Sequence, residues 1–583
     1  MTKTLLGSLR EYKKGSIRTI LLSVLEAAFE ILIPLRMADL IDQGIDLGNM
    51  AAVWKFGIAI LIFAALQLLT GVLSAHIAAK TSVGFSANLR QDMYDNVQTF
   101  SFSNIDKFST ASIVTRLTTD VTNIQNAYQM LIRMAVRGPV MLVFSMIVSF
   151  RINTTIALIF LAVIPIMAVL LLLIIRKVGP FFNRVFRTYD TLNNVVQENV
   201  QGIRVVKSFD QEDHEIKKFK GISQSIYEDF AAGERLLAFN SPIMQFFMYA
   251  CMILISWIGA KAIVASGNNA ALGMTTGDLT ALFSYATQIL MALMMLSMVF
   301  TMITISLASA RRIAKVLEEK TDIANPTGAE MTVRDGSIRF EQVSFAYAAK
   351  ANKKVLSDID LSIASGQTVG IIGGTGSSKS SLVQLIPRLY DVSSGQLLLG
   401  GVDVRKYDLN VLRNAVAMVL QKNELFSGTI KENLRWGNES ATDEEIEEAC
   451  RLACADEFIQ SFPDKYDTYI EQGGTNVSGG QKQRLCIARA LLKKPKVLIL
   501  DDSTSAVDTK TDASIQKSLS TFLPDTTKLI IAQRVSSVQH ADLIVVMDDG
   551  KIAACGTHDE LLKTCDIYRE VYESQQEGDS EHE

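Results

Sequence analysis

The chain has 583 residues, which is too long for a single hydrophobic core and suits two or more domains. Hydrophobic residues make up 49% of it, more than a soluble protein needs, so membrane-spanning segments are expected. A formal net charge of −4 provides no polyanion-binding surface, which argues against nucleic acid as a partner.

Six apolar runs in the first half are long enough to cross about 30 Å of hydrocarbon. The loops after the second and fourth runs are long and basic, whereas the opposite loops are short and carry little positive charge. Because Lys and Arg accumulate on the cytoplasmic side, a multi-pass protein of the cell membrane is predicted, with its N-terminus and C-terminal half in the cytoplasm. The runs cover residues 18–40, 57–79, 131–150, 154–176, 240–264 and 280–308.

The two long polar stretches, residues 80–130 and 177–235, are predicted to be helical. Their segments from Ala87 and Leu192 show neither strand alternation nor proline. About 25 extra helical residues would extend a span roughly 35–40 Å beyond the membrane. Residues 1–320 are therefore predicted to form a helical membrane domain with two long cytoplasmic loops.

The rest of the chain has a different pattern. Residues 321–335 contain polar residues, proline and glycine and are predicted to be a linker. Residues 336–575 alternate strand and helix patterns, as α/β nucleotide-binding domains do. The acidic tail, residues 576–583, is expected to be disordered.

A glycine-rich loop at residues 373–380 is predicted to bind phosphate. It follows the apolar strand Thr368–Ile372 and precedes a helical pattern, which is the context that such a loop requires. Backbone N–H groups would hold the phosphates, Lys379 would reach the β and γ oxygens, and Ser380 would ligate Mg²⁺. Ser378 stands where the motif normally has glycine, so a strained dihedral is expected. The expected contacts are Gly373, Gly374, Thr375, Gly376, Ser377, Ser378, Lys379, Ser380 and Ser381.

Two later segments fit the same chemistry. Residues 477–481, Val-Ser-Gly-Gly-Gln, form a second nucleotide-contacting motif, and the apolar strand at residues 497–501 ends on Asp501, a candidate Mg²⁺ ligand. With Lys-Gln-Arg at residues 482–484, these motifs resemble the signature of ATP-binding cassette (ABC) transporters. Six spans before one cassette resemble a half-transporter of the exporter type, over essentially the full chain.

The resemblance implies further roles. Tyr347 would stack on adenine, Gln421 would sense the γ-phosphate and Mg²⁺, and Asp508 would lie in a loop that crosses to a second cassette, after Ser505 and Ala506. Two cassettes close head-to-tail in this family, so each ATP lies between one chain's phosphate loop and the other chain's signature. The signature residues here are Ser478, Gly479, Gly480 and Gln481.

Two catalytic positions depart from the family pattern. Asp502 replaces the glutamate that polarises the attacking water, and Gln533 replaces the histidine that contacts the γ-phosphate. The shorter aspartate places its carboxylate about 1.5 Å back, an error worth about 10²-fold in rate. Glutamine cannot carry positive charge. Binding of ATP and Mg²⁺ should survive while hydrolysis weakens, as in the degenerate-site subunit of heterodimeric bacterial multidrug exporters; a homodimer that uses aspartate as base is the alternative.

Two membrane features are candidate substrate sites. Glu26 and Glu30 lie one helical turn apart in the first run, where they could attract cationic substrates, couple protonation to transport, or bond a neighbour such as Gln67. Met291, Met295 and Met298 belong to a methionine stripe that suits a pliable drug-contacting wall, although helix packing is the commoner reason for such a stripe.

These observations predict a subunit that exports amphipathic compounds with a second ABC chain in the lipid bilayer. Two other interpretations stay open: a homodimeric or heterodimeric exporter dedicated to lipid or peptide, and, from another class, an ATP-gated channel or non-transporting ATP sensor. Transport that depends on turnover would separate the exporter from a channel that ATP binding alone could open.

Overall fold

The computed structural model describes residues 2–269, 271–347, 354–503 and 507–580. The chain divides into two compact units. Unit 1 comprises residues 1–98 and 109–319, and unit 2 comprises residues 99–108 and 320–583. The short segment 99–108 therefore belongs with the second unit, although the first unit surrounds it in sequence.

Unit 1 consists of helices and the short turns that join them over its described length. A single extended residue, Asn153, separates two of its long helices, and the Asn153 side chain caps the second by accepting a bond from the Ile156 N–H (3.1 Å). Two π-helical turns, Ile41–Ile45 and Arg116–Asp120, interrupt the pattern. The α-helices are α1 (Thr2–Gly7), α2 (Lys13–Leu40), α3 (Met50–Gln98), α5 (Thr110–Thr115), α6 (Val121–Ile152), α7 (Thr154–Gln201), α8 (Ile203–Ser208), α9 (Glu212–Leu237), α10 (Asn240–Ser266) and α11 (Thr276–Glu318).

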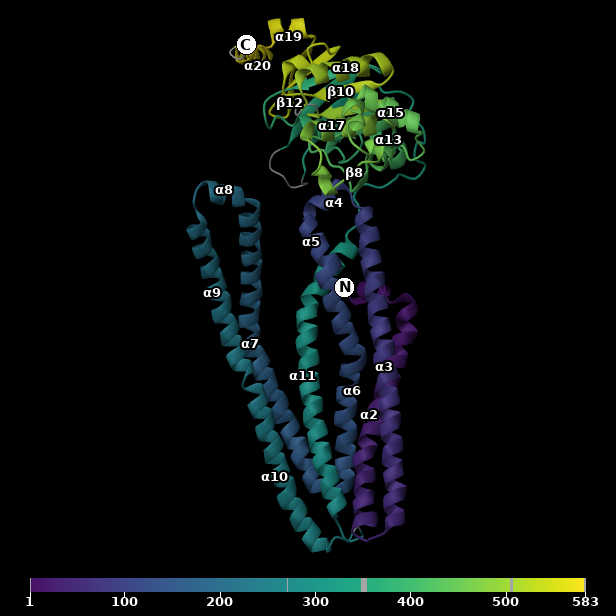
Figure 1. Ribbon diagram of the computed structural model, residues 1–583, viewed down its shortest axis with the longest axis vertical. Helices are drawn as coiled ribbons and strands as arrows, with labels where there is room; N and C mark the ends of the chain where they lie inside the picture. The colour runs from purple at the N-terminus through teal and green to yellow at the C-terminus, as the bar shows by residue number, and fades with distance from the viewer. Residues whose placement is uncertain (1, 270, 348–353, 504–506, 581–583) are drawn as a thin grey trace. The chain divides into compact units, whose positions relative to one another are not determined.

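Helices α2, α3, α6 and α11 pack against one another, and α7 packs along α9. In Figure 1, α7 and α9 form a long pair joined by α8 at one end. Most of residues 80–130 and 177–235 is helical, as predicted. Helices α3 and α7 continue past their apolar runs, α6 begins ahead of its run, and α9 is a separate helix within the second stretch.

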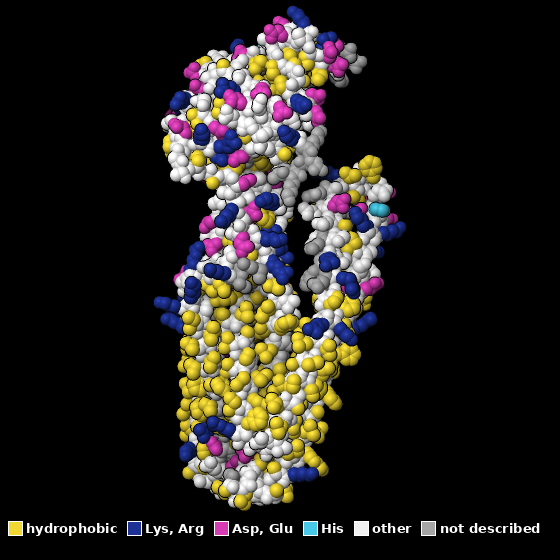
Figure 2. All heavy atoms as spheres, turned by 180° about the vertical axis from the view of Figure 1, so that it is seen from behind, with side chains coloured by type: hydrophobic (Ala, Val, Ile, Leu, Met, Phe, Trp, Pro, Cys, Tyr) yellow, Lys and Arg dark blue, Asp and Glu magenta, His cyan; other side chains and the backbone are white. Residues whose placement is uncertain are grey.

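Five helical segments among the described residues are long and apolar enough to cross a membrane. Figure 2 shows hydrophobic side chains covering the visible face of the unit 1 helices, with charged side chains toward their ends. The first predicted run forms α2, which is not one of the five because charged side chains such as Glu26 and Glu30 interrupt it. The five are Met50–Gln98, Thr110–Ile152, Thr154–Gln201, Glu212–Ser266 and Thr276–Glu318.

Unit 2 is built on a six-stranded sheet with the order β12-β11-β3-β10-β9-β6. Its pairs are parallel except β11 with β12. The five parallel strands are mostly buried, as expected where helices cover both faces of such a sheet, whereas the edge strand β12 is partly exposed. Their bounds are β3 (Thr368–Ile372), β6 (Val416–Val419), β9 (Val497–Asp501), β10 (Thr527–Ile531), β11 (Leu543–Asp548) and β12 (Lys551–Gly556).

A four-stranded antiparallel sheet, with the order β2-β1-β4-β5, packs beside the first sheet through one shared hydrophobic cluster. It comprises β1 (Ile338–Phe345), β2 (Leu356–Ile363), β4 (Ser394–Leu399) and β5 (Val402–Asp403), and a separate pair joins β7 (Gly428–Thr429) to β8 (Tyr469–Ile470). The helices are α4 (Phe102–Lys107), α12 (Lys379–Gln384), α13 (Leu409–Ala415), α14 (Ile430–Arg435), α15 (Asp443–Leu452), α16 (Asp456–Gln460), α17 (Gly479–Leu491), α18 (Thr509–Phe522), α19 (His558–Thr564) and α20 (Asp566–Ser580).

The acidic tail differs from the expectation of disorder. Helix α20 continues to Ser580, and residues 581–583 lie outside the described part. The physical reason is that Tyr568 anchors the start of this helix in the core, and the Glu and Gln residues that follow have high helix propensity.

Candidate functional site

The carboxyl ends of three neighbouring strands meet at one edge of the six-stranded sheet: β3, β9 and β10. In open α/β sheets ligands bind beyond this edge, so the loops that follow these strands define the site. They surround a cavity of about 550 Å³. It is lined by Ile372, Gly373, Gly374, Thr375, Gly376, Ser378, Lys379, Ser380, Ser381, Gln421, Asp501, Asp502, Ile531, Gln533 and Val571.

The phosphate loop holds its lysine over the cavity. Lys379 Nζ donates to the carbonyl oxygens of Gly373 (2.8 Å) and Gly374 (2.9 Å) and to the Ser377 hydroxyl (3.2 Å). Burial lowers the pKa of the Lys379 ammonium, and two nearby aspartate carboxylates oppose that shift. An ammonium held by oxygen atoms at the start of α12 is placed to bind phosphate oxygens.

Backbone conformation confirms the strain expected in this loop. Ser378 lies in the left-handed region, with φ 72° and ψ 22°. For a residue other than glycine, the left-handed conformation costs about 1–2 kcal/mol. Position 373 requires glycine, since a Cβ at that position would lie 2.2 Å from the Met547 carbonyl oxygen.

Ser380 and Asp501 form the candidate Mg²⁺ site. The Ser380 hydroxyl donates to Asp501 Oδ1 (2.9 Å), and Asp501 is only 3% exposed. Burial raises the pKa of the Asp501 carboxyl, and the Ser380 bond opposes this. Hydroxyl, carboxylate and Gln421 amide oxygens are hard ligands that fit Mg²⁺, which when bound would neutralise charge on the phosphates.

The two departures from the family pattern contact each other. Gln533 Nε2 donates to Asp502 Oδ2 (2.7 Å), and Gln421 Nε2 lies 3.5 Å from the same oxygen. Asp502 has φ 48°, and its N–H donates to the Ile531 carbonyl (3.1 Å). The Asp502 carboxylate is thus held by two amides, neither of which can take up a proton near neutral pH.

Tyr347 lies beside the loop without lining the cavity among the described residues. Its hydroxyl is 2.8 Å from Ser381 Oγ, and its ring meets the Tyr390 ring edge-on, with centroids 5.1 Å apart. Tyr347 is 47% exposed. An exposed ring next to the phosphate loop is suited to stack on a nucleotide base.

The signature residues lie elsewhere in unit 2. Ser478 Oγ accepts from the Gln481 N–H (3.3 Å) and Gln481 Oε1 accepts from the Ser478 N–H (2.9 Å), a capping box that starts α17. None of the residues 478–481 lines the cavity, as far as the described residues go. This separation is what a site completed by a second cassette requires.

Asp508 is also outside the cavity. It caps α18 by accepting from the Thr511 N–H (2.9 Å), and this bond lowers the pKa of its carboxyl. The preceding residues that carried the resemblance, Ser505 and Ala506, lie outside the described residues.

Helix α20 contributes residues that sequence reasoning did not identify. Val571 lines the cavity, and Gln575 bonds the loop that carries Gln533. No phosphate-binding motif marks these residues. The sequence feature that could have identified them is the helical spacing of Tyr568, Val571 and Gln575, which places the three residues along one face.

In unit 1, the two membrane carboxylates are paired with arginine. Arg137 of α6 donates to Glu26 (2.8 Å) and to Glu30 (2.5 Å) of α2, and Arg133 lies 3.9 Å from Glu26. Among the described residues, the side-chain partners of these carboxylates are arginines, rather than an amide such as Gln67. Glu26 is 5% exposed, and its Oε2 has no hydrogen-bond partner among the described residues.

Most of the surface of two methionines of the stripe is exposed in this chain. Met291 and Met298 of α11 are 59% and 62% exposed, whereas Ala292 and Leu293 beside them are buried. Met295 is half-buried. Packing within this chain thus accounts for part of Met295 but not for Met291 and Met298.

The chain matches two protein families. Residues 17–294 match the family described as ABC transporter transmembrane region, and residues 356–505 match the family described as ABC transporter. The structure of a bacterial Atm1-family ABC exporter with ATP bound superposes with a TM-score of 0.83, covering 97% of this chain and 99% of that one at 22% identity, which shows a shared fold.

Relatives match over nearly the whole length. An uncharacterized ABC transporter ATP-binding protein of Bacillus subtilis, YfiB, is 37% identical, with 98% of each chain covered. An uncharacterized ABC transporter ATP-binding protein of Mycobacterium tuberculosis, Rv1273c, is 34% identical over 97% of each chain. An ATP-dependent lipid A-core flippase of Desulfotalea psychrophila is 32% identical, covering 88% of this chain and 89% of that protein.

Proposed function

This chain belongs to the ABC transporter family, as a membrane-spanning, ATP-hydrolysing exporter subunit that uses ATP and Mg²⁺, and we propose that it is the degenerate-site half of a heterodimeric exporter. ABC exporters act as dimers in a lipid bilayer.

The 2.7 Å bond between Gln533 and Asp502 carries the proposal. A catalytic base must lie within reach of the water that it polarises. Asp502 is one methylene shorter than glutamate, and its carboxylate accepts from Gln533 and faces Gln421. Gln533 in turn cannot supply the positive charge of a protonated histidine at the γ-phosphate. This chain's phosphate loop therefore holds ATP and hydrolyses it slowly.

The signature of this chain serves the other site. Ser478, Gly479 and Gly480 match the family pattern, and a partner with its own phosphate loop, glutamate and histidine would hydrolyse ATP against them. Binding of ATP closes the two cassettes on each other and turns the substrate pathway of the membrane domains outward. Hydrolysis at the partner's site resets the dimer, while the slow site favours the closed state.

For the membrane domain we propose six spans, with α2 as the first. Its charges need not face lipid, because Arg137 and Arg133 together balance Glu26 and Glu30 within the helix bundle. With six spans the N-terminus and the cassette both lie in the cytoplasm, as the Lys and Arg distribution predicts.

The proposed substrates are amphipathic compounds such as lipophilic drugs. Exposed Met291 and Met298 supply a polarizable surface that adapts its shape, with Met295 beside them. Because the two glutamates lie beside two arginines, Arg137 and Arg133, the four side chains together offer little net negative charge to a cation. We therefore assign the selectivity to apolar contact rather than to attraction of positive charge.

Lipid export is the second candidate function. Its support is the similarity to the lipid A-core flippase of Desulfotalea psychrophila at 32% identity. A lipid has the same amphipathic character as the proposed compounds, so the methionine surface suits both.

Reconstitution in vesicles tests the function. The exporter moves a fluorescent amphipathic dye or a labelled lipid only while ATP is hydrolysed, and Lys379→Ala in this chain slows that movement. Movement that a non-hydrolysable ATP analogue supports equally well would contradict the exporter and indicate a gated conductance. Movement of the lipid alone would favour the second candidate.

A further inference from the structure

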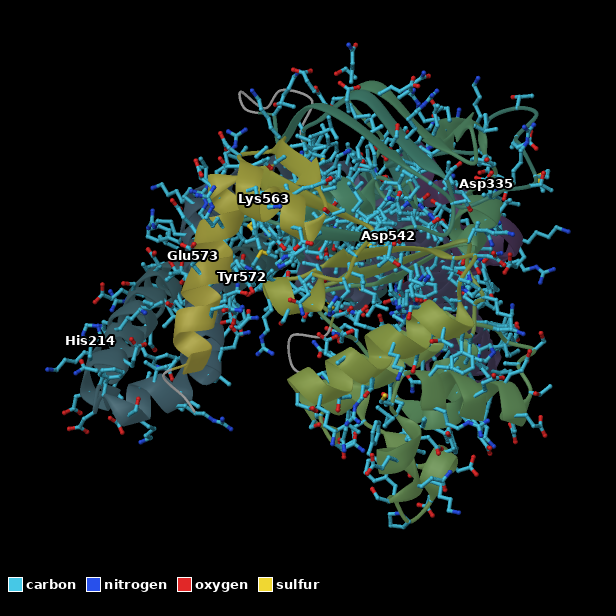
Figure 3. The ribbon with its side chains drawn as sticks, turned by 90° about the horizontal axis from the view of Figure 1, so that it is seen from above. His214, Asp335, Asp542, Lys563, Tyr572 and Glu573 are labelled. Carbon is cyan, nitrogen blue, oxygen red and sulfur yellow. The ribbon has the colours of Figure 1, made fainter. Side chains whose placement is uncertain are left out.

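Helix α20 contacts two parts of the nucleotide site at once. Tyr568, at 0% exposure, packs in one hydrophobic cluster with Ile372, which immediately precedes the phosphate loop, and with Val535, which follows Gln533. Val571, one turn later, lines the cavity itself. Figure 3 shows α20, with Tyr572 and Glu573 labelled, running along the edge of unit 2.

Gln575, one further turn along, bonds the backbone of the loop that carries Gln533. Its Nε2 donates to the Gln533 carbonyl oxygen (2.8 Å), and its Oε1 accepts from the Val535 N–H (2.8 Å). One amide side chain therefore satisfies a carbonyl and an N–H that lie two residues apart. Both bonds are to the backbone, so they do not depend on which side chain stands at position 533.

The start of α20 is fixed independently of these bonds. His558 Nδ1 lies 2.7 Å from the Tyr568 hydroxyl, and its ring meets the Tyr572 ring edge-on at 5.2 Å. Because Tyr568 and Tyr572 anchor the helix, Gln575 is presented from a rigid element. A rigid support of this kind is what holds a functional side chain in one geometry.

We propose that Gln575 is a positioning residue for the nucleotide site: it fixes the 533–535 backbone so that Gln533 stays bonded to Asp502, and α20 thereby sets how long this chain retains ATP. This rests on the proposed role of the chain as the slow, nucleotide-holding half. Gln575 acts through the loop and does not itself touch the cavity among the described residues.

The test compares Gln575→Met with Gln576→Met in the full chain, purified from membranes with the chain that accompanies it. Gln576 is a matched control, since its Nε2 donates within α20, to the Tyr572 hydroxyl (2.7 Å), and no bond to residues 532–538 is found among the described residues. Two quantities are measured: amide hydrogen exchange of residues 532–538, and release of a fluorescent methylanthraniloyl-ATP.

Loss of both Gln575 bonds is expected to speed exchange in residues 532–538, and release of the analogue, by about tenfold. Gln576→Met should change neither. A Gln575→Met protein with wild-type exchange and release would overturn the proposal, as would equal effects of the two variants.

Gln575→Glu keeps the inference testable if the methionine variant folds poorly. Glutamate still accepts from the Val535 N–H but cannot donate to the Gln533 carbonyl, so an intermediate effect is expected and a wild-type response would overturn the proposal. Failure of the unmodified protein to bind the analogue would instead refute nucleotide holding, while exchange of residues 532–538 would still test the bonds of Gln575.

Discussion

Asp502 and Gln533 form one contact, so their substitutions should act together rather than additively. We expect the double change Asp502→Glu and Gln533→His to raise ATP hydrolysis at this chain's own phosphate loop by about 10-fold or more, because it restores both the reach of the carboxylate and a side chain that can be protonated. Each single change should give less than half of the gain in activation free energy. Steady-state phosphate release measures this in a dimer whose partner carries alanine at its own phosphate-loop lysine, so that only this chain's site contributes.

Adding Lys379→Ala to the double variant is the control for this prediction. Lys379→Ala removes the ammonium at this chain's phosphate loop. The increase in ATP hydrolysis should therefore disappear if that increase arises at this chain's own site. Turnover that stays at the wild-type level in the double variant would mean that Asp502 and Gln533 do not limit hydrolysis.

Ser378 offers a separate residue-scale prediction. Ser378→Gly relieves about 1–2 kcal/mol of left-handed strain, offset by about 0.5–1 kcal/mol of added chain entropy, so a net stabilisation of about 0.5–1 kcal/mol is expected. The midpoint of thermal unfolding of the cassette should rise. The neighbouring Ser377→Gly, which loses the 3.2 Å contact to Lys379, should lower it; a fall with both variants would contradict the strain argument.

At the scale of elements, the pairing of α2 with α6 depends on Arg137. Arg137→Met leaves Glu26 and Glu30 without their main partner and should destabilise unit 1 by about 3–5 kcal/mol. The triple change Glu26→Gln, Glu30→Gln and Arg137→Met removes the charges together and should recover most of that loss. Thermal unfolding in lipid nanodiscs distinguishes the two variants, and equal losses would show that the ion pairs are not what matters.

The methionine face of α11 predicts a change in substrate response. Met291→Ala and Met298→Ala remove polarizable surface that is exposed in this chain, so an amphipathic compound should stimulate ATP turnover with an apparent KM raised by about 3- to 10-fold. Basal turnover should stay unchanged. The same changes at buried Leu293 are expected to lower stability instead, and an unaltered KM in the methionine variants would remove this face from the substrate site.

Sequence patterns predicted the elements that have a strong local signal. The strand–glycine loop–helix at residues 368–386 and the long helices beyond the apolar runs could be placed because periodicity and turn chemistry define them. Side-chain contacts between segments that lie far apart in the sequence could not be predicted in this way. Arg137 lies over a hundred residues from Glu26, and nothing in either segment specifies the other.

Helix α20 shows the same limit at the end of the chain. Its acidic composition favoured disorder, yet Tyr568 buries its start, and this tertiary contact decides the outcome. The contact of Gln575 with residues 533–535 likewise depends on how the helix docks on the sheet edge. Composition alone carries no information about either contact.

For the whole molecule, asymmetry implies unequal nucleotide residence at the two sites of the dimer. Hydrolysis against this chain's signature should release ADP within each cycle, whereas ATP at this chain's phosphate loop should persist over many cycles. Trapping labelled nucleotide during turnover and photo-crosslinking it to each chain should therefore find intact ATP mainly on this one. Equal residence and equal hydrolysis on both chains would contradict this asymmetry.

The composition of the dimer tests the central claim most directly. The chain would be tagged in its native membrane, extracted gently, and its stoichiometric companions identified by mass spectrometry. The account predicts a second six-span ABC chain that carries glutamate and histidine where this chain has Asp502 and Gln533. Recovery of this chain alone, as a homodimer with both sites carrying Asp502 and Gln533, would contradict it.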